Sequence, residues 1–452
     1  MSAPLEVDQL RVGMFIHLDL GWWAHPFALS SFAITSPDQI ETIRGLGLKK
    51  LRWSPDKSLP AAAASAAPAP AAAAGNVVES AESAGSAESA ESAAPAAPAE
   101  PAEPLAAAVR IDDPAAQRRA AIDAQRAADR RCAQQYGEAA SAWNAVADQV
   151  RSDPQGARVA TEGLTHSLLS KMMVDDEMCV RVLSLAPGDQ DSAHALNVAV
   201  MSLLLGRVFG LTASEMLELG TGALLHDIGK LDLPDRVRHL AAQCSGADKA
   251  LYGEHVAHGV VQGKRMGLSS GALLVLAQHH EMADGSGFPL RLKIDRMAAA
   301  ARIVSLVNRY DNLCNPKALA QALTPHEALS LIFAQTRAKF DASMLNAFIR
   351  MMGVYPPGSF VQLTDDRFAS VLSVNSSRPL KPRVLVCDPE VPMAQALPLN
   401  LEREANLGVR RSLKPAQLPA EVHRCLAPRQ RVVYFFEPAH ATALQAEAVS
   451  AA

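Results

Sequence analysis

The sequence predicts a mainly α-helical protein with a small α/β module at its N-terminus and a short α+β extension at its C-terminus. Between residues 190 and 353, apolar residues recur at helical spacing, and two capping boxes, Thr212–Glu215 and Thr324–Glu327, each open a helix. Short runs of β-branched and aromatic residues gather instead near the two ends of the chain. An all-helical central domain with small mixed flanking parts is therefore expected.

Residues 1–58 form the predicted N-terminal module. Weak alternation of apolar residues from Leu5 to Leu20 is typical of a half-buried strand, and Ser36-Pro37-Asp38 is a helix start. Gly47 would end this helix, and a return strand is expected from Leu48 to Trp53. Several rings of the module are interpreted as packing residues or an interaction surface: His17, Trp22, Trp23 and His25.

The next two segments differ sharply in composition. Residues 59–112 consist almost entirely of Ala, Pro, Ser and Glu, which provide no large apolar side chains to offset the entropy cost of ordering the chain. They are predicted to be a disordered linker. Residues 113–185 are rich in Ala, Arg and Gln, and are predicted to form a helical connector that packs on the next domain.

Residues 186–357 form the predicted all-helical domain, in which Asp341 is expected to cap a helix that ends at Gly353. Residues 358–452 change character and form the predicted α+β extension. Three of its segments have the composition of short strands, at 361–374, 383–386 and 432–436. The residues themselves do not indicate what this extension does.

The composition argues against several classes of protein. With 43 basic and 47 acidic residues the formal net charge is −4, so no basic excess points to a nucleic-acid polymer as partner. No apolar stretch is long enough to span a membrane, and the N-terminus lacks the features of a signal peptide. The six cysteines are scattered without a CxxC pair and are interpreted as reduced thiols. A cytoplasmic location is the default expectation.

The chemistry of the helical domain is expected around the segment Leu224-Leu225-His226-Asp227-Ile228-Gly229-Lys230. A histidine beside an aspartate at a helix end offers an imidazole and a carboxylate that can bridge two metal ions. Gly229 is predicted to let the chain turn left-handed, so that Lys230 returns towards the site. Such a pair alone is commonplace, but five histidines on four predicted helices are a stronger signal: His194, His226, His255, His279 and His280.

The segment from His279 to Pro289, HHEMADGSGFP, resembles the HHExxDGxGYP signature of HD-GYP phosphodiesterases, with Phe288 in place of tyrosine. His194, the His226–Asp227 pair and His255 extend this resemblance over the whole helical domain. Near the N-terminus, the segment from Val7 to Met14 and the rings that follow it are similar to a small domain often found ahead of HD-GYP domains.

The resemblance implies a metal-dependent phosphodiesterase that hydrolyses cyclic di-GMP to pGpG or GMP in second-messenger signalling. It implies two divalent metal ions bridged by Asp227, with iron or manganese expected from the ligand types. One ion would be held by His194, His226 and Asp227, and the other by Asp227, His255, His279 and His280. A hydroxide shared by the ions would attack phosphorus in line.

Further roles are carried over from the resemblance. Lys230 would stabilise the transition state or orient the nucleophile. Glu281 and Asp284 would order the signature loop. Three residues would contact the substrate: Gly287, Phe288 and Lys317. Besides cyclic di-GMP, protein partners of the signalling network are expected, while the sequence does not indicate an oligomeric state.

Three features depart from the family pattern. Asn308 occupies the place of a metal-binding aspartate, so it is expected to offer a carbonyl oxygen without a negative charge. In the segment whose basic residues grip phosphate in the family, Lys317 supplies one cation and Ala320 supplies none. Gln190 replaces a glutamate that binds a third metal in some members, so two metal ions are expected.

Three functions follow as alternatives. The first is an active cyclic di-GMP phosphodiesterase, favoured by the intact histidines, Asp227 and Lys230. The second is a catalytically weakened or inactive regulatory or scaffold protein, favoured by Asn308 and the altered phosphate-binding segment. The third is a phosphohydrolase that acts on another nucleotide.

Overall fold

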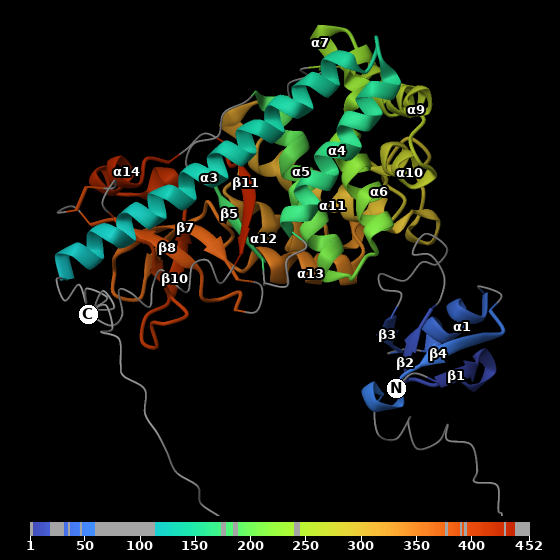
Figure 1. The fold of residues 1–452 in the computed structure, drawn as a ribbon, viewed down its shortest axis with the longest axis horizontal. Coiled ribbons are helices and arrows are strands. Elements are labelled where there is room, and N and C mark those ends of the chain that lie inside the picture. The colour runs from blue at the N-terminus through green and yellow to red at the C-terminus, as the bar shows by residue number, and fades with distance from the viewer. Residues whose placement is uncertain are drawn as a thin grey trace, which may run out of the picture. The chain divides into compact units, whose positions relative to one another are not determined.

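A computed structural model describes most of the chain (Figure 1). The described residues are 3–18, 31–34, 37–45, 48–58, 114–172, 178–183, 189–238, 245–375, 378–388, 391–392, 396–428 and 431–438. The predicted linker at 59–112 and the rings of Trp22, Trp23 and His25 lie outside these residues. The chain divides into two compact units, a small N-terminal one and a large one that contains residues 115–452.

The small unit contains a four-stranded sheet in the order β1-β4-β2-β3 and one helix. Its elements are β1 (Ala3–Glu6), β2 (Phe15–His17), β3 (Ser31–Ala33), α1 (Pro37–Gly45) and β4 (Lys50–Trp53). The predicted return strand and helix are confirmed. The predicted strand from Leu5 to Leu20 is wrong in extent, because a 3-10 turn at Val7–Gln9 and the left-handed Gly13 (φ 96°) separate β1 from β2.

The large unit is mainly helical, as predicted. Its helices are α3 (Pro114–Gln149), α4 (Pro154–Met172), α5 (Gln190–Val208), α6 (Ala213–Leu225), α7 (Asp235–Arg238), α8 (Gly246–Gly253), α9 (His255–Met266), α10 (Ser270–Gln278), α11 (Ala299–Cys314), α12 (Pro325–Gln335), α13 (Ala342–Met352) and α14 (Ala420–Leu426). Helix α5 is apolar on all sides and buried from Ala195 to Gly206, which makes it the centre of the core.

The helix ends follow the predicted signals. Thr212 and Thr324 each accept a hydrogen bond from the main chain three residues on, with Glu215 and Glu327 closing the two capping boxes. Asp341 caps α13 by accepting from Ser343 N and Met344 N, and the helix ends before Gly353. These local signals fix where α6, which ends directly before the predicted ligands His226 and Asp227, begins.

A seven-stranded sheet joins segments from both sides of the helical domain. Its strands are β5 (Met178–Val182), β6 (Phe360–Leu363), β7 (Phe368–Val374), β8 (Arg383–Val386), β9 (Leu399–Asn400), β10 (Val409–Leu413) and β11 (Tyr434–Pro438). The strands predicted at 383–386 and 432–436 are confirmed, whereas the one predicted at 361–374 divides into β6 and β7 at a turn that contains Asp366 (φ 70°). The prediction of helix throughout 113–185 is wrong for β5, because this segment pairs with β7 and β11, both far away in sequence.

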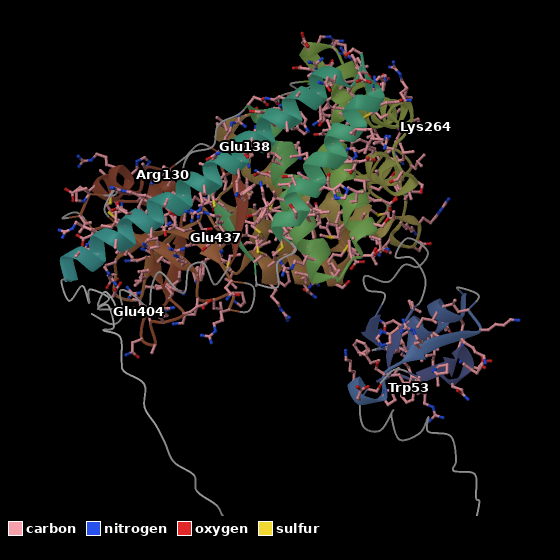
Figure 2. All side chains as sticks on the ribbon, in the orientation of Figure 1. Trp53, Arg130, Glu138, Lys264, Glu404 and Glu437 are labelled. Atoms are coloured by element: carbon pink, nitrogen blue, oxygen red, sulfur yellow. The ribbon has the colours of Figure 1, made fainter. Side chains whose placement is uncertain are left out.

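Helix α3 packs on the helical domain, as predicted for the connector, and also on the sheet. Trp143 Nε1 donates to Leu224 O over 2.9 Å, at the end of α6. The buried Arg181 of β5 bonds Asp129 of α3 and Glu437 of β11, each over 2.6 Å. Figure 2 shows Glu437 beneath α3, with Glu138 on the outer side of that helix. Connector, helical domain and extension therefore share one compact unit.

Two further expectations concern the membrane and the cysteines. Among the described residues, no helix combines the length and apolarity that a membrane span requires. The five described cysteines form no disulfide with one another.

Candidate metal centre

Asp227 lies directly after α6, between the helix cap His226 and a 3-10 turn at Ile228–Asp232. Its Oδ2 atom is 3.4 Å from His194 Nε2 and 3.5 Å from His226 Nε2. Its Oδ1 atom is 3.5 Å from His255 Nε2 and 3.7 Å from His279 Nε2. The two oxygens of one carboxylate thus face two different groups of histidines, which is the geometry that a bridging ligand needs.

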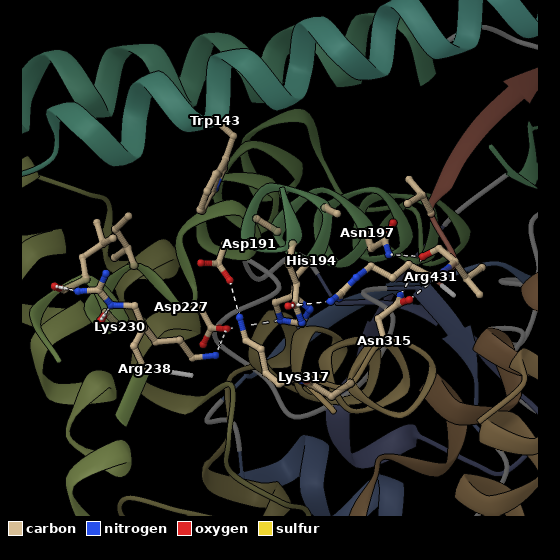
Figure 3. Close-up of a pocket in the computed structure, with 18 residues that line it drawn as sticks. Trp143, Asp191, His194, Asn197, Asp227, Lys230, Arg238, Asn315, Lys317 and Arg431 are labelled. Atoms are coloured by element: carbon tan, nitrogen blue, oxygen red, sulfur yellow. Dashed lines mark hydrogen bonds and ion pairs between the residues drawn. The ribbon is translucent and has the colours of Figure 1, made fainter. Parts of the chain in front are cut away.

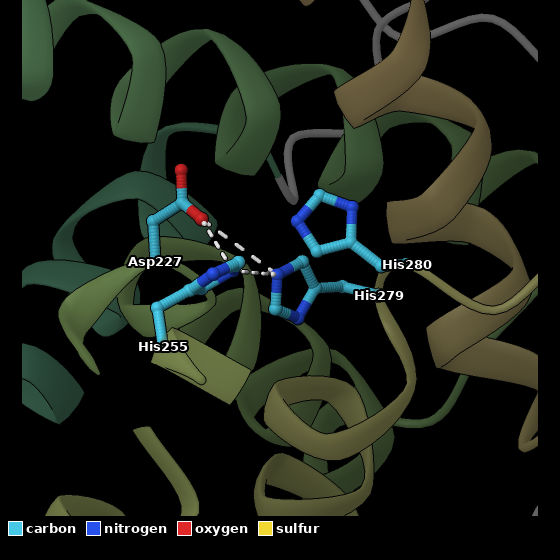
Figure 4. A group of neighbouring side chains, drawn as sticks. All are labelled: Asp227, His255, His279 and His280. Atoms are coloured by element: carbon cyan, nitrogen blue, oxygen red, sulfur yellow. Dashed lines mark hydrogen bonds and ion pairs between the residues drawn. The ribbon is translucent and has the colours of Figure 1, made fainter. Parts of the chain in front are cut away.

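Four elements bring the predicted ligands together: α5, the end of α6, the start of α9 and the end of α10. The first group contains His194, His226 and Asp227, and in each group the ligand atoms lie within 4.8 Å of one another. Figure 4 shows the second group, with Asp227 facing the imidazoles. Its members are Asp227, His255, His279 and His280.

Main-chain carbonyls orient three of the imidazoles. The Nδ1 atoms of His226, His255 and His279 lie 2.6 to 2.9 Å from carbonyl oxygens three residues earlier in the chain. A carbonyl only accepts hydrogen bonds, so each Nδ1 carries the proton and each Nε2 keeps its lone pair. Those lone pairs point at Asp227 and at one another, an arrangement that calls for a cation between them.

Two buried atoms of the cluster have no hydrogen-bond partner, namely Asp227 Oδ1 and His280 Nε2. Such orphaned buried acceptors are costly unless a ligand satisfies them. Imidazole nitrogens with a shared carboxylate suit first-row transition metals. The residues present therefore fit divalent metal ions in both groups.

The proton affinities of the histidines also favour cation binding. Burial lowers the pKa of His226 to about 4 and that of His255 to about 3, and it holds the pKa of His280 well below its usual range. These three rings are neutral at pH 7 and need not lose a proton to bind a metal ion.

His194 is the exception within the cluster. Burial disfavours its cation, but hydrogen bonds and negative charge from Asp227 and Asp311 outweigh that effect and raise its pKa to about 9. Burial likewise opposes charge on Asp227 and Lys230, yet their mutual attraction wins, so the pKa of Asp227 falls and that of Lys230 rises. Lys230 is therefore a cation at the site, held on Asp227 and over the ring of Tyr252.

Asp311 is a functional residue that the sequence did not single out as a partner of the ligands. Its Oδ2 atom is 2.6 Å from His194 Nδ1, and its Oδ1 accepts from the amides of Asn197 and Asn315. The side chain is fully buried in α11. It orients His194 in the way that carboxylates orient metal-bound imidazoles. The sequence signal that could have identified Asp311 is its position one helical turn after Asn308.

Replacing Asp311 by asparagine is expected to weaken metal binding about 10- to 100-fold. An asparagine side chain has one oxygen, which accepts hydrogen bonds, and one NH2 group, which only donates. Its oxygen can face either His194 or the two asparagine amides, so its NH2 group must face another donor. Metal titration of the variant would measure the loss. Thermal unfolding with excess chelator would report the folding cost separately, and unchanged metal affinity would contradict the assigned role.

Gly229 has a different role from the one predicted. It lies in the 3-10 turn and does not adopt a positive φ. A Cβ atom at this position would lie 2.0 Å from His255 O and 2.3 Å from Gly259 N. Glycine is required here because the turn that carries Asp227 packs directly against the main chain of α9, which carries His255.

Asn308 is buried in α11, and its side-chain oxygen accepts a hydrogen bond from Asn312. An amide oxygen has a second lone pair, so this contact leaves room for the predicted metal-binding role. That role stays a prediction. The side chain supplies no negative charge to offset a divalent cation.

The signature loop is held by its glutamate, as predicted. Glu281 is fully buried and accepts from Leu290 N over 2.6 Å and from Leu292 N over 2.8 Å. A Cβ atom at Gly287 would lie 2.4 Å from Met282 N, so this glycine serves the close packing of the loop. Phe288 stacks on His280, with ring centroids 4.5 Å apart, and is 36% exposed.

An open groove adjoins the cluster of candidate metal ligands, and cationic side chains dominate its charged lining. The cations are Lys230, Arg238, Lys249, Arg291, Arg309 and Lys317, and the acidic lining residue is Glu254. Tyr252 and Phe288 contribute aromatic surface. Lys317, the predicted phosphate contact, forms an ion pair with Asp191 over 2.7 Å, so its role as a substrate contact stays a prediction.

Two family models match the chain. Residues 3–160 match a domain of unknown function, DUF3391, and residues 177–344 match the HD domain. The chain is 29% identical over 198 residues to the cyclic di-GMP phosphodiesterase PA4108 of Pseudomonas aeruginosa, covering 43% of this chain and 47% of that protein. It is 24% identical over 191 residues to the cyclic di-GMP phosphodiesterase PdeB of Borreliella burgdorferi, covering 42% and 50%.

Residues 177–344 are an HD domain of the HD-GYP family. The matched region spans about half the length of these two relatives. A third relative, the 3'3'-cGAMP-specific phosphodiesterase 2 of Vibrio cholerae, is 27% identical over 162 residues, covering 35% of this chain and 31% of that protein. The HD-GYP domain thus resembles enzymes named for two different cyclic dinucleotides. Helix α3 falls within the match to the domain of unknown function, not within the HD match.

Proposed function

We propose that this protein is a metal-dependent phosphodiesterase that hydrolyses cyclic di-GMP to a linear product. The observation that carries this proposal is Asp227, whose two carboxylate oxygens face two groups of histidines from four helical elements. The names of the relatives support the reaction class and the substrate class. Two divalent cations, iron or manganese, are the proposed cofactors.

The groove beside the cluster supports a cyclic dinucleotide as substrate. Such a molecule carries two phosphodiester groups and two purine rings, which require cations and aromatic surface close together. Lys249 of α8, Arg309 of α11 and Arg291 of the loop between α10 and α11 line the groove. Arg291 has a left-handed backbone (φ 54°), a strained state for arginine of the kind found at binding sites. Phe288, with part of its ring exposed, offers stacking surface for a base.

The residues of the site have different roles in the proposed hydrolysis. Bound cations would lower the pKa of water and offset charge on the phosphoryl oxygens. Three imidazoles, locked by main-chain carbonyls, would keep their Nε2 atoms in place without rearrangement during the reaction. Lys230, held on Asp227, would present its remaining N–H groups to a phosphoryl oxygen as negative charge grows there.

Hydrolysis by purified full-length protein tests the proposal. The protein is loaded anaerobically with Fe(II) or Mn(II) and incubated with cyclic di-GMP, with 3'3'-cGAMP as the competing substrate, and products are separated by chromatography. Appearance of pGpG or GMP from cyclic di-GMP is the expected result. Folded, metal-loaded protein that cleaves neither dinucleotide would overturn it, and faster cleavage of 3'3'-cGAMP would reassign the substrate.

Asn308 favours a second candidate, a regulatory protein that binds metal or nucleotide with little turnover. Replacing Asn308 by aspartate is expected to raise metal affinity and turnover about 10-fold or more, because it adds a negative charge beside the cations. Asn346→Asp, at an exposed position of α13 outside the cavity, is the control for the added charge. A weakly active wild type with an active Asn308→Asp variant would support the second candidate. An unchanged rate would show that Asn308 does not limit the site.

A further inference from the structure

The last described segment of the chain, residues 431–438, reaches the metal centre. Strand β11 pairs with β5 and runs along α5, the helix that carries His194. Just before the strand, Val432 N donates to Asn315 Oδ1 over 2.8 Å, and Val432 O accepts from Asn315 and Asn197. Tyr434 N donates to Asn197 Oδ1 over 2.8 Å. Two asparagines of the HD-GYP domain therefore hold this segment in place.

The same two asparagines connect the segment to the metal ligands. Both donate to Asp311 Oδ1, over 2.7 and 2.9 Å, and Asp311 Oδ2 is bonded to His194. Tyr434 OH also hydrogen-bonds Tyr310 OH of α11 over 2.9 Å. The hydrogen-bond network that orients His194 therefore also fixes the position of the C-terminal segment. A side chain of this segment consequently has a fixed position relative to the candidate metal ligands.

Arg431 extends from this segment into a cavity whose lining includes two of the predicted metal ligands, His194 and Asp227. Figure 3 shows it beside His194, Asn197 and Asn315. The lining of the cavity also includes Lys230 and Gln190. The guanidinium donates from Nη2 to Gln190 Oε1 over 2.9 Å, while its Nη1 group is buried without any hydrogen-bond partner. A buried unpaired N–H pair on a charged group calls for an anion.

The other cations of this cavity already have carboxylate partners. Lys230 is bonded to Asp227, and Lys317 to Asp191 over 2.7 Å. Arg238 donates to three main-chain carbonyls and lies 3.5 Å from Asp235. Among the described residues that line the cavity, Arg431 is the cation paired with a neutral amide instead of a carboxylate. Its charge is the one left available to a ligand.

We propose that Arg431 binds a phosphoryl oxygen of the substrate, so that the C-terminal extension completes the phosphodiesterase site. This inference rests on the proposed function, since it takes the cavity to be where a phosphodiester meets the metal ions. A guanidinium can hold two oxygens of one phosphate through parallel N–H groups, which lysine cannot do. It also adds a phosphate contact to a chain whose segment after α11 offers Lys317 and lacks a cation at Ala320.

Substitution of Arg431 by glutamine tests the inference, because glutamine keeps a polar N–H group but carries no charge. Binding of pGpG and of inorganic phosphate to the manganese-loaded full chain is measured by calorimetry, together with KM and kcat for cyclic di-GMP. We expect about 10- to 100-fold weaker binding of both probes and a matching rise in KM. Arg431→Lys should recover part of the loss. Metal content and thermal unfolding should stay at wild-type values.

Arg424→Gln is the matched control, since Arg424 is an exposed arginine of α14 in the same extension and outside the cavity. Arg431→Gln that binds pGpG and phosphate as tightly as wild type would overturn the inference while leaving the proposed function intact. A wild type that binds these probes through Arg431 but cleaves no cyclic dinucleotide would overturn the proposed function alone. A wild type that binds neither probe would overturn the inference as well.

Discussion

Replacement of Asp227 by asparagine is expected to empty the metal centre and to lower hydrolysis of cyclic di-GMP at least about 100-fold. The carboxylate faces His194 and His226 with one oxygen and His255 and His279 with the other. The oxygen of an asparagine amide can face one group of histidines, but the NH2 group, which only donates hydrogen bonds, then faces the other group. Metal content should fall from about two ions per chain to below one, as measured by plasma mass spectrometry after anaerobic loading.

Asp235→Asn is the control for this substitution, because Asp235 lies eight residues further on with a side chain that is 87% exposed. It should retain metal and activity. Asp227→Asn also leaves the charge of Lys230 without its carboxylate partner, so thermal unfolding of both variants without metal is needed to separate folding from binding. Full occupancy by two ions in Asp227→Asn would show that the two ligand groups do not share a bridge.

Substitution of Gly229 by alanine is expected to destabilise the protein by about 3 kcal/mol or more. The added methyl group would lie 2.0 Å from His255 O and 2.3 Å from Gly259 N, which are main-chain atoms that cannot rotate away. Relief of the clash requires α9 to move away from the turn that carries Asp227. The variant should therefore lose metal affinity together with stability, as measured by denaturant unfolding and metal titration.

Gly259→Ala provides the matched control from the opposite side of the same contact. A Cβ atom at Gly259 would meet Gly229 N at 3.6 Å, an ordinary van der Waals distance. Because alanine is a better helix former than glycine, this variant should be as stable as wild type or slightly more stable. If the two variants were equally stable towards denaturant, the close approach of the turn to α9 would not be the reason for a glycine at Gly229.

The sequence by itself predicted most helical elements and the residues that cluster as candidate metal ligands. Thr212, Thr324 and Asp341 act through main-chain groups two or three residues away, so their capping roles could be predicted before the fold was known. The His226–Asp227 pair and the signature loop were recognisable because residue types and spacings in short segments carry that information. The ligands predicted on four elements do come together around Asp227.

Other features depended on contacts between residues far apart in the chain. Gly229 was predicted to turn left-handed, but its neighbour is the main chain of α9, which no local pattern reveals. Strand β5 was assigned to a helical connector, because its partners β7 and β11 lie about 190 to 260 residues further along the chain. The strand exists because those partners satisfy its hydrogen bonds, which is a property of the fold.

The surroundings of the metal ligands were decided by the tertiary structure. Asp311 orients His194 across 117 residues of sequence, and the segment that carries Arg431 is held by asparagines 117 and 235 residues away. A ligand can be recognised from its own residue type and local motif, whereas the groups that orient it or supply charge beside it can come from any element. For this reason the histidine and aspartate pattern predicted the centre of the site, and only the packing of α11 and the C-terminal extension showed what surrounds it.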